Sequence, residues 1–141
     1  MRGYSLLELT AALALLALVW SALTPRLVGY HDRTAVLAAR EVLVGLLLET
    51  RTAAVRAGGA SLHIDATSGR AWITVGDSRT REQEVGDGRR VSVVLGGGRT
   101  QTEIPYSGLG LGVFANETVE LIAGSERARL VVSAYGRVRR D

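Results

Sequence analysis

Residues Leu6–Leu23 have the sequence LLELTAALALLALVWSAL, and this apolar stretch sets the class of protein to which the chain can belong. Glu8 is its only charged residue, and Thr10 and Ser21 are its only other polar side chains. A helix needs about 20 mostly apolar residues to cross the hydrocarbon core of a bilayer. We therefore predict a transmembrane helix over residues 4–30, with the basic start at Arg2 in the cytoplasm.

A cleavable secretory signal peptide is the alternative interpretation of this segment. The apolar region of such a signal usually has about 7 to 15 residues and ends at a small-x-small cleavage site. The best candidate site, Val19-Trp20-Ser21, contains the bulky side chain of Trp20, and the apolar stretch is longer than a signal requires. The sequence therefore favours a permanent membrane anchor.

The composition argues against several function classes. All 17 basic residues of the 141-residue chain are arginine, and with 14 acidic residues the net charge is +3. Because the sequence has no cysteine, disulfides, thiolate zinc sites and cysteine nucleophiles are excluded. His31 and His63 are the only histidines, and neither shows the pattern of base, nucleophile and orienting partner that an active site requires. We predict that the protein is not an enzyme and uses no catalytic residue, metal or cofactor.

Glu8 is the anomalous residue of the apolar stretch. An ionised carboxylate deep in hydrocarbon costs about 2.5 to 3.5 kcal/mol on insertion scales, so such a group usually has a function and a partner. The alternative is that Glu8 only extends to the membrane interface, because it lies near the start of the segment. That alternative explains why the charge is tolerated, but it does not explain the sequence around it.

Residues 31–57 predict an amphipathic helix. The segment is rich in helix-forming residues, and Leu43, Leu47 and Ala54 recur at helical spacing. Gly58 follows the segment and suits a C-terminal cap. We expect the apolar stripe of this helix to pack against a β-sheet formed by the rest of the chain.

Residues 58–141 predict a β domain of short antiparallel strands separated by glycine-rich turns. We expect Pro105 to end one strand, and we assign the charged stretch 76–88 to a loop because it lacks apolar periodicity. The predicted fold class is α+β, with a long N-terminal helix, half transmembrane and half amphipathic, packed on antiparallel β-sheets. The expected strands cover residues 62–65, 71–75, 90–95, 99–104, 118–122 and 130–133.

The residues around Glu8 carry a family resemblance. The segment Gly3-Tyr4-Ser5-Leu6-Leu7-Glu8-Leu9, followed by an apolar helix, resembles the class III signal of type IV pilins and pseudopilins. In that family a prepilin peptidase cuts after the glycine and methylates the new N-terminus, which is usually phenylalanine. The resemblance implies a leader over residues 1–3, with Gly3 before the cut and Tyr4 as the mature N-terminus. It also implies that Glu8 neutralises the terminal amine of a neighbouring subunit.

Pro25 fits the same resemblance, since many pilins have a helix-bending proline at this place. Proline cannot donate a backbone hydrogen bond, so we expect Pro25 to kink or locally melt the helix. One bent helix over residues 4–57 would be about 80 Å long at about 1.5 Å per residue.

The rest of the chain is similar to the GspH/FimT group of minor pilins and pseudopilins. The similarity covers the helix from Arg40-Glu41 to Gly58, the strand after it, and the closing segment Gly136-Arg137-Val138-Arg139. It implies a structural subunit at or near the tip of a type II secretion pseudopilus or a type IV pilus. Its implied partners are prepilin peptidase, other pilins or pseudopilins, and inner-membrane lipid. Its implied location is the inner membrane, with a single span and a C-terminal domain in the periplasm or in an extracytoplasmic filament.

The arginine-rich C-terminus supports a different function. Guanidinium groups bind phosphate through bidentate hydrogen bonds, and a basic cluster is the electrostatic signature of nucleic-acid binding. Some FimT-type proteins are DNA receptors in natural transformation and end in a similar glycine-arginine motif, although secretion-type members also end in Gly-Arg segments. The alternative function is therefore a DNA-binding minor pilin, with contacts from Arg137, Arg139 and Arg140. Five arginines lie between Gly124 and the end of the chain, where Glu126 and Asp141 are the only acids: Arg127, Arg129, Arg137, Arg139 and Arg140.

Overall fold

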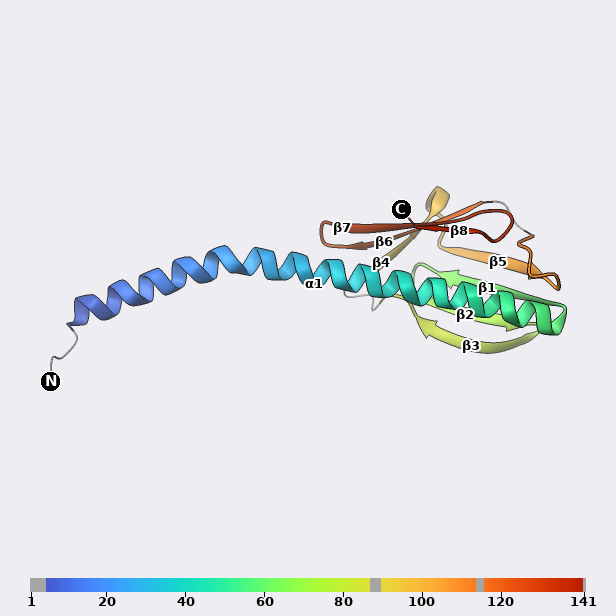
Figure 1. Ribbon diagram of the computed structural model, residues 1–141, viewed down its shortest axis with the longest axis horizontal. Coiled ribbons are helices and arrows are strands. Elements are labelled where there is room, and N and C mark those ends of the chain that lie inside the picture. Colours follow the sequence, from blue (N-terminus) through green and yellow to red (C-terminus); the bar gives the residue numbers. More distant parts are fainter. Residues whose placement is uncertain (1–4, 87–89, 114–115, 141) are drawn as a thin grey trace.

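The computed structural model describes residues 5–86, 90–113 and 116–140, and for residues 22–27 it describes the backbone alone. In this described part, one long helix, α1 (Leu6–Ala57), is followed by eight β-strands in two four-stranded sheets. Figure 1 shows the N-terminal half of α1 extending away from the sheets and the C-terminal half lying along them. The two helical segments expected from the sequence therefore form one continuous helix.

The first sheet has the strand order β3-β2-β1-β5 and the second has the order β4-β6-β7-β8, and every pairing is antiparallel. The short 3-10 helix η1 (Gly96–Gly98) connects the second sheet to the first. The α+β fold class, with a long helix on antiparallel sheets, is confirmed. The strands are β1 (Gly59–Asp65), β2 (Arg70–Val75), β3 (Ser78–Glu84), β4 (Ser92–Leu95), β5 (Gln101–Ser107), β6 (Glu117–Ala123), β7 (Glu126–Val132) and β8 (Val138–Arg140).

The C-terminal half of α1 buries one face against the sheets. Leu43, Leu47 and Ala54, the residues at helical spacing, are each at most 2% exposed. Thr50 is buried on the same face, and its hydroxyl donates to the carbonyl oxygen of Leu46 at 2.7 Å, which satisfies a polar group that water cannot reach. The predicted packing of the apolar stripe is therefore confirmed.

The C-terminal end of α1 is set by Gly58. This residue has a φ of 84°, in the left-handed region that glycine adopts without strain, and β1 starts at the next residue. The predicted C-terminal cap is confirmed. The tight reversal lets β1 run back along the helix that precedes it.

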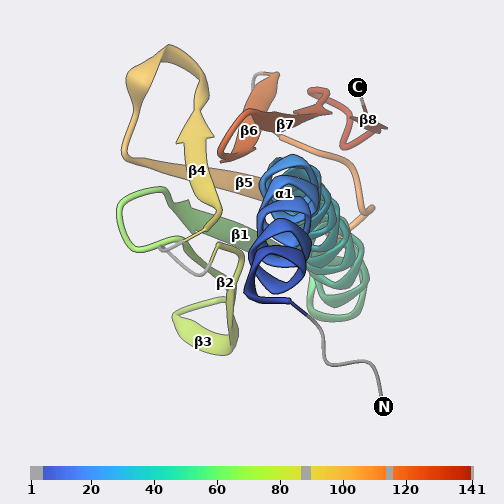
Figure 2. The same cartoon turned by 90° about the vertical axis from the view of Figure 1, so that its left-hand side faces the viewer.

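The two sheets and α1 share one hydrophobic core. In β1, Leu62 and Ile64 are almost fully buried while His63 between them is partly exposed, and in the second sheet Leu121 and Leu130 are buried in the same way. Figure 2, viewed along α1, shows β6, β7 and β8 on one side of the helix and β1, β2 and β3 on another. Each sheet therefore has a second face, called its outer face here, that points away from this core.

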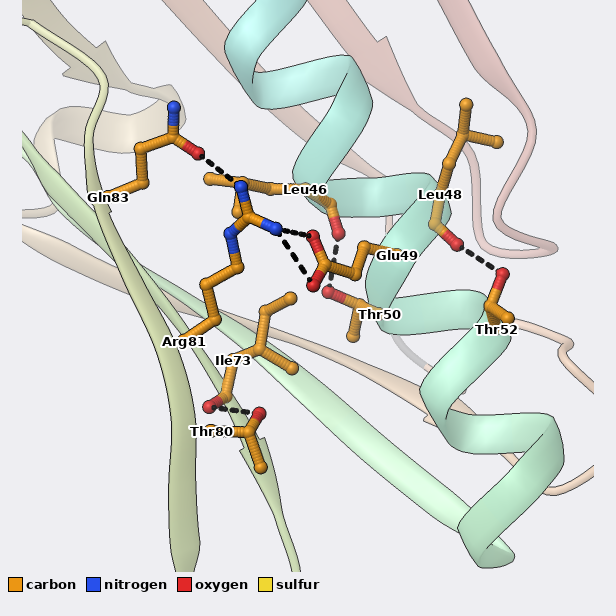
Figure 3. Close-up of polar contacts among 9 residues, drawn as sticks. All are labelled: Leu46, Leu48, Glu49, Thr50, Thr52, Ile73, Thr80, Arg81 and Gln83. Carbon is orange, nitrogen blue, oxygen red and sulfur yellow. Dashed lines mark hydrogen bonds and ion pairs between the residues drawn. The ribbon is translucent and has the colours of Figure 1, made fainter.

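The charged stretch 76–88 contains β3, so its assignment to a loop is wrong. That assignment rested on missing apolar periodicity, but β3 is an edge strand whose side chains are nearly all exposed, so burial imposes no alternation. Charged side chains of β3, rather than apolar ones, contact the rest of the molecule. Figure 3 shows Arg81 reaching Glu49 of α1, at 2.9 Å from Nη1 to Oε2, while Nη2 donates to Oε1 of Gln83 at 3.4 Å.

Pro105 does not end its strand, because β5 continues to Ser107. The carbonyl oxygen of Pro105 accepts the N–H of Val113 at 3.0 Å, so this residue turns its backbone groups to the open edge of the sheet, away from β1. A proline at such a position removes no hydrogen bond from the ladder. The prediction was wrong because it did not consider an edge strand.

An ion pair with a buried carboxylate and a half-exposed guanidinium joins the two sheets. Glu117 of β6 is 4% exposed and accepts hydrogen bonds from Nη2 of Arg99 at 2.7 and 2.8 Å and from Oγ1 of Thr102 in β5 at 3.1 Å. Arg99 also donates through Nε to the carbonyl oxygen of Gly96 at 3.0 Å. These bonds compensate for the desolvation of the carboxylate and fix β5 beside β6.

Candidate functional site

The predicted processing residues Gly3 and Tyr4 lie outside the described residues. The described chain begins at Ser5, the N-cap of α1. The N–H of Glu8 donates to Oγ of Ser5 at 3.2 Å, and the N–H of Ser5 donates to Oε2 of Glu8 at 3.1 Å. This reciprocal capping box satisfies two N–H groups at the helix start, and it is signalled in the sequence by Ser5-Leu6-Leu7-Glu8, a pattern the prediction overlooked.

The N-terminal half of α1 exposes its apolar side chains. In a water-soluble molecule such a surface is costly, so it marks a contact with lipid or with another protein. Within the residues that the structure describes, no helical stretch meets the length and hydropathy required of a membrane span. The exposed large side chains of this half, each at least 54% exposed, are Leu6, Leu7, Leu9, Leu13, Leu15, Leu16, Leu18, Val19, Trp20 and Val28.

Pro25 lies inside α1, and the helix continues through it. Figure 1 shows a bend in the blue N-terminal half of the helix. The side-chain contacts of Pro25 lie outside the described part of the structure, so its role in this bend stays a prediction.

Four of the five C-terminal arginines gather on the outer face of the second sheet. Arg127 and Arg129 alternate along β7 with buried residues, which places them on the outer face. Arg137 and Arg139 flank Val138, which packs against the core, so they point to the same outer face. We call these four residues the arginine face.

Arg140 points to the opposite side of the same sheet. It lies opposite Leu130, a core residue, and its Nη2 is 3.6 Å from Oε2 of Glu41 in α1. The structure therefore brings together Arg137 and Arg139 of the three predicted DNA contacts and places Arg140 against the helix. The difference follows from strand alternation, which puts neighbouring residues on opposite sides of β8, and the pairing with β7 decides which residue takes which side.

Gly136, the glycine of the closing Gly-Arg motif, is required by local geometry. Its φ is 76°, and a Cβ at this position would lie 2.6 Å from Cε1 of Tyr106. Any other residue would clash with this ring, which is itself buried. Burial raises the pKa of the Tyr106 hydroxyl, and the nearby charge of Arg51 acts in the opposite direction.

The outer face of the first sheet carries an aromatic stack that the sequence analysis did not predict. The rings of His63 and Trp72 are parallel within 7° at 5.4 Å, and the guanidinium carbon of Arg79 lies 4.2 Å from the centre of the Trp72 ring. His63 Nε2 is 3.0 Å from Oγ1 of Thr74. The turn has four residues, 66–69, so Asp65 pairs with Arg70 and His63 with Trp72, whereas counting outward from the predicted three-residue turn Thr67-Ser68-Gly69 would place Ile64 opposite Trp72.

Carboxylates surround this stack. The carboxylate of Glu82 lies 2.8 Å from Nη1 of Arg79 and 3.3 Å from Nη1 of Arg70. Oε1 of Glu103 lies 4.0 Å from Nε2 of His63. The N–H of Thr67 donates to Asp65, and this hydrogen bond is the main cause that lowers the pKa of that carboxyl below its ordinary value. No cluster of side chains in the described part of the chain is arranged to hold a metal ion.

The fold resembles solved structures of minor pilins. It superposes on the type IV minor pilin FimU of Pseudomonas aeruginosa with a TM-score of 0.63 and 15% identity, covering 79% of this chain and 92% of that structure. A second crystal form of FimU gives a TM-score of 0.58 at 16% identity, over 74% of this chain and 91% of that structure. The minor pseudopilin EpsH, from the type 2 secretion system of Vibrio cholerae, superposes with a TM-score of 0.55 at 14% identity, over 74% of this chain and 94% of that structure.

The comparisons establish the fold of the chain. No protein-family model matches the sequence, and no curated protein matches it. Because all three structural likenesses are at low identity, they show a shared architecture. The chain therefore has a type IV pilin-like fold, and its assignment to the GspH/FimT group remains a prediction.

Proposed function

We propose that this protein is a minor pilin or pseudopilin, a non-catalytic subunit that assembles with other pilins. The observation that carries the proposal is the division of α1 into a half that exposes its apolar side chains and a half that buries one face against the β domain. A subunit built in this way can pack its apolar half with the helices of neighbours while its domain stays in water. The pilin-like fold supports the proposal.

The N-terminal half of α1 also supports a membrane location before assembly. We propose that residues 4–30 span the inner membrane and that the β domain lies in the periplasm or in an extracytoplasmic filament. Prepilin peptidase removes residues 1–3 after Gly3 and leaves N-methylated Tyr4. Intact-mass analysis of the membrane-extracted protein tests this, and retention of Met1 or cleavage near Ser21 overturns it.

Glu8 is the proposed assembly residue. In a filament its carboxylate receives the terminal amine of a neighbour, whereas in the single chain it accepts the N–H of Ser5. Glu8→Leu removes an isolated charge from an apolar segment, so membrane insertion is retained while co-purification with sister pilins is lost. Glu126→Leu, which removes a partly exposed carboxylate at the start of β7, is the matched control. Unchanged co-purification of the Glu8 variant refutes the assignment.

The position in the assembly is part of the proposal. The subunit belongs at or near the tip of a type II secretion pseudopilus or a type IV pilus, as the GspH/FimT resemblance implies. Immunogold labelling of sheared filaments tests this position. Label distributed along the filament, rather than at its end, contradicts a tip subunit.

The arginine face supports a second candidate, a DNA-binding minor pilin that acts as a receptor in natural transformation. Arg137 and Arg139 lie on one face with two further arginines, whereas Arg140 is paired with Glu41. If Arg137 and Arg139 each contact one phosphate of duplex DNA, the logarithm of the binding constant should fall against the logarithm of the salt concentration with a slope of about −1.8, or roughly 0.9 per contact. Fluorescence anisotropy with the full chain in detergent measures it, and Arg137→Gln with Arg139→Gln should flatten the slope. Arg140→Gln is the control, and a slope indifferent to the double substitution removes this candidate.

A further inference from the structure

An apolar patch lies at the end of the molecule farthest from the N-terminus. Figure 1 shows the loop after β5, the turn between β7 and β8 and the last turn of α1 gathered at this end. Among the described residues, five large apolar side chains of these segments are each at least 46% exposed, and Leu109 is 81% exposed. We call this surface the distal patch, defined by Val55 of α1, Leu109, Leu111 and Val113 of the loop, and Tyr135 of the turn.

Close backbone packing joins the three segments of the distal patch. A Cβ at Gly110 would lie 3.0 Å from Cγ2 of Val55, so the loop lies against α1. A Cβ at Gly136 would lie 3.4 Å from the backbone nitrogen of Gly112, so the turn between β7 and β8 lies against the same loop. The five side chains therefore belong to one continuous surface.

The loop of the distal patch is ordered although its apolar side chains are exposed. The N–H of Ser107 donates to the carbonyl oxygen of Leu111 at 2.9 Å, and the N–H of Gly110 donates to that of Ser107 at 2.8 Å. The N–H of Val113 donates to the carbonyl oxygen of Pro105 at 3.0 Å. A contiguous apolar patch held in this way marks a protein interface, because an ordered surface loses little conformational entropy when a partner binds.

The position of the distal patch excludes inner-membrane lipid as its occupant. If residues 4–30 span the membrane as proposed, residues 31–57 of α1 separate the bilayer from the patch by about 40 Å, at about 1.5 Å per residue. An apolar contact at that distance must be made with protein. The patch faces away from the membrane.

The opposite end of the β domain does not match the distal patch. The turn between β1 and β2 and the turn between β6 and β7 project there, and Figure 1 shows both on the side of the N-terminal half of α1. The exposed residues of these two turns are Thr67, Ser68, Gly124 and Ser125, so the turns offer no apolar surface. A second copy of this chain, placed beyond the first, would set these polar turns on the patch. The occupant is therefore a different chain.

We infer that the distal patch is the docking surface for the β domain of a different pilin-like subunit, which stands farther from the membrane than this chain. The inference rests on the proposed function, because it needs α1 to be anchored and packed among the helices of sister subunits. Subunits anchored in a membrane can join a filament only at its base, so the far end of each one faces subunits that joined earlier. This chain is therefore near the tip without being its outermost subunit.

Polar substitution of the distal patch tests the contact. Leu109→Ser with Val113→Ser changes two exposed side chains, so the β domain should fold as before, with an unchanged midpoint in urea. When the full chain is purified in detergent from the membranes of its own cells, the yield of at least one sister pilin should fall about tenfold or more, because the contact loses the burial of two apolar side chains. Leu48→Ser with Val94→Ser, which changes exposed side chains of α1 and β4 outside the distal patch, is the matched control and leaves the yield unchanged.

A cross-link from the distal patch identifies its occupant. The natural chain has no cysteine, so Leu109→Cys can be labelled alone with a benzophenone maleimide and activated by light in isolated membranes. We expect this chain to be joined to a sister pilin, at the end of that subunit's β domain nearest its own N-terminal helix. Ser125→Cys, at the opposite end of the domain, is the control and should not form this product.

The other outcomes overturn the inference. A yield of every sister pilin that is indifferent to the patch substitutions, or an equal loss in the control variant, shows that the distal patch is not the contact. A cross-link to a second copy of this chain, to lipid, or to the N-terminal helix of a sister pilin assigns the patch to another occupant. If no sister pilin co-purifies even with the natural chain, the proposed function fails and the inference falls with it. If sister pilins co-purify equally with the natural chain and the patch variant, the inference alone fails.

Discussion

Arg99→Met and Glu117→Leu break the same ion pair, yet we expect unequal losses of stability. The Glu117 side chain is 5% exposed, whereas that of Arg99 is 51% exposed. Removing Arg99 leaves a buried carboxylate whose one remaining side-chain partner among the described residues is the hydroxyl of Thr102, and leaving a buried charge unpaired in this way costs about 3 to 5 kcal/mol. Removing Glu117 leaves a guanidinium that water can reach, so the cost is about 1 to 2 kcal/mol for the lost hydrogen bonds.

Urea unfolding of the full chain in detergent measures this difference. Trp72 fluorescence in a Trp20→Phe background reports on the β domain alone, because Trp20 belongs to the N-terminal half of α1. With an m-value of about 2 kcal/mol/M, a difference of about 2 kcal/mol separates the two midpoints by about 1 M. Equal midpoints, or a lower midpoint for Glu117→Leu, would refute the argument that burial of the carboxylate dominates the energetics of the pair.

Three further predictions concern local geometry. Gly136→Ala should cost about 1 to 3 kcal/mol in thermal or urea unfolding, because it adds backbone strain and a clash with Tyr106, whereas Gly97→Ala, with a φ of 72° and open space around it, adds strain alone. Ser5→Ala should remove about 0.5 to 2 kcal/mol of helix stability, seen as faster amide exchange in the first turn of α1, and unchanged exchange would contradict the capping box. The hydrogen bond that lowers the pKa of Asp65 stabilises the fold at pH values above the ordinary pKa of 3.8. This stabilisation is lost as the pH falls through the folded pKa, so Asp65→Asn should flatten the acid limb of the curve of stability against pH. A pH profile identical to that of the natural chain would show that the Asp65 turn contributes nothing.

The parts of the fold that bury one face could be predicted from the sequence. Leu43, Leu47 and Ala54 identify the buried stripe of α1, because a helix repeats every 3.6 residues and the core accepts only apolar side chains. Leu62 and Ile64 identify β1 by strict alternation. At these positions local pattern and tertiary packing give the same answer.

The parts that depend on register could not be predicted in the same way. β3 has no buried face and therefore no periodic signal, and Pro105 is tolerated only because its backbone points to the open edge. Alternation along β8 separates Arg140 from Arg139, and the residues of β7 opposite them decide which of the two faces the core. Composition gave the arginine cluster correctly, but the side of the sheet on which each arginine lies is a property of strand pairing.

The polar edge strand β3 has a consequence for crowding. An unpaired strand edge is a template on which another chain can add a strand, and charged side chains together with an irregular register make such addition unfavourable. β3 presents Arg79, Arg81, Glu82 and Glu84 at this edge, and its register with β2 shifts between Ile73 and Thr74. Domains at high local density are thereby protected from merging into one sheet through this edge. A contact made at β3 must use side chains, and such a contact can dissociate without unfolding either domain.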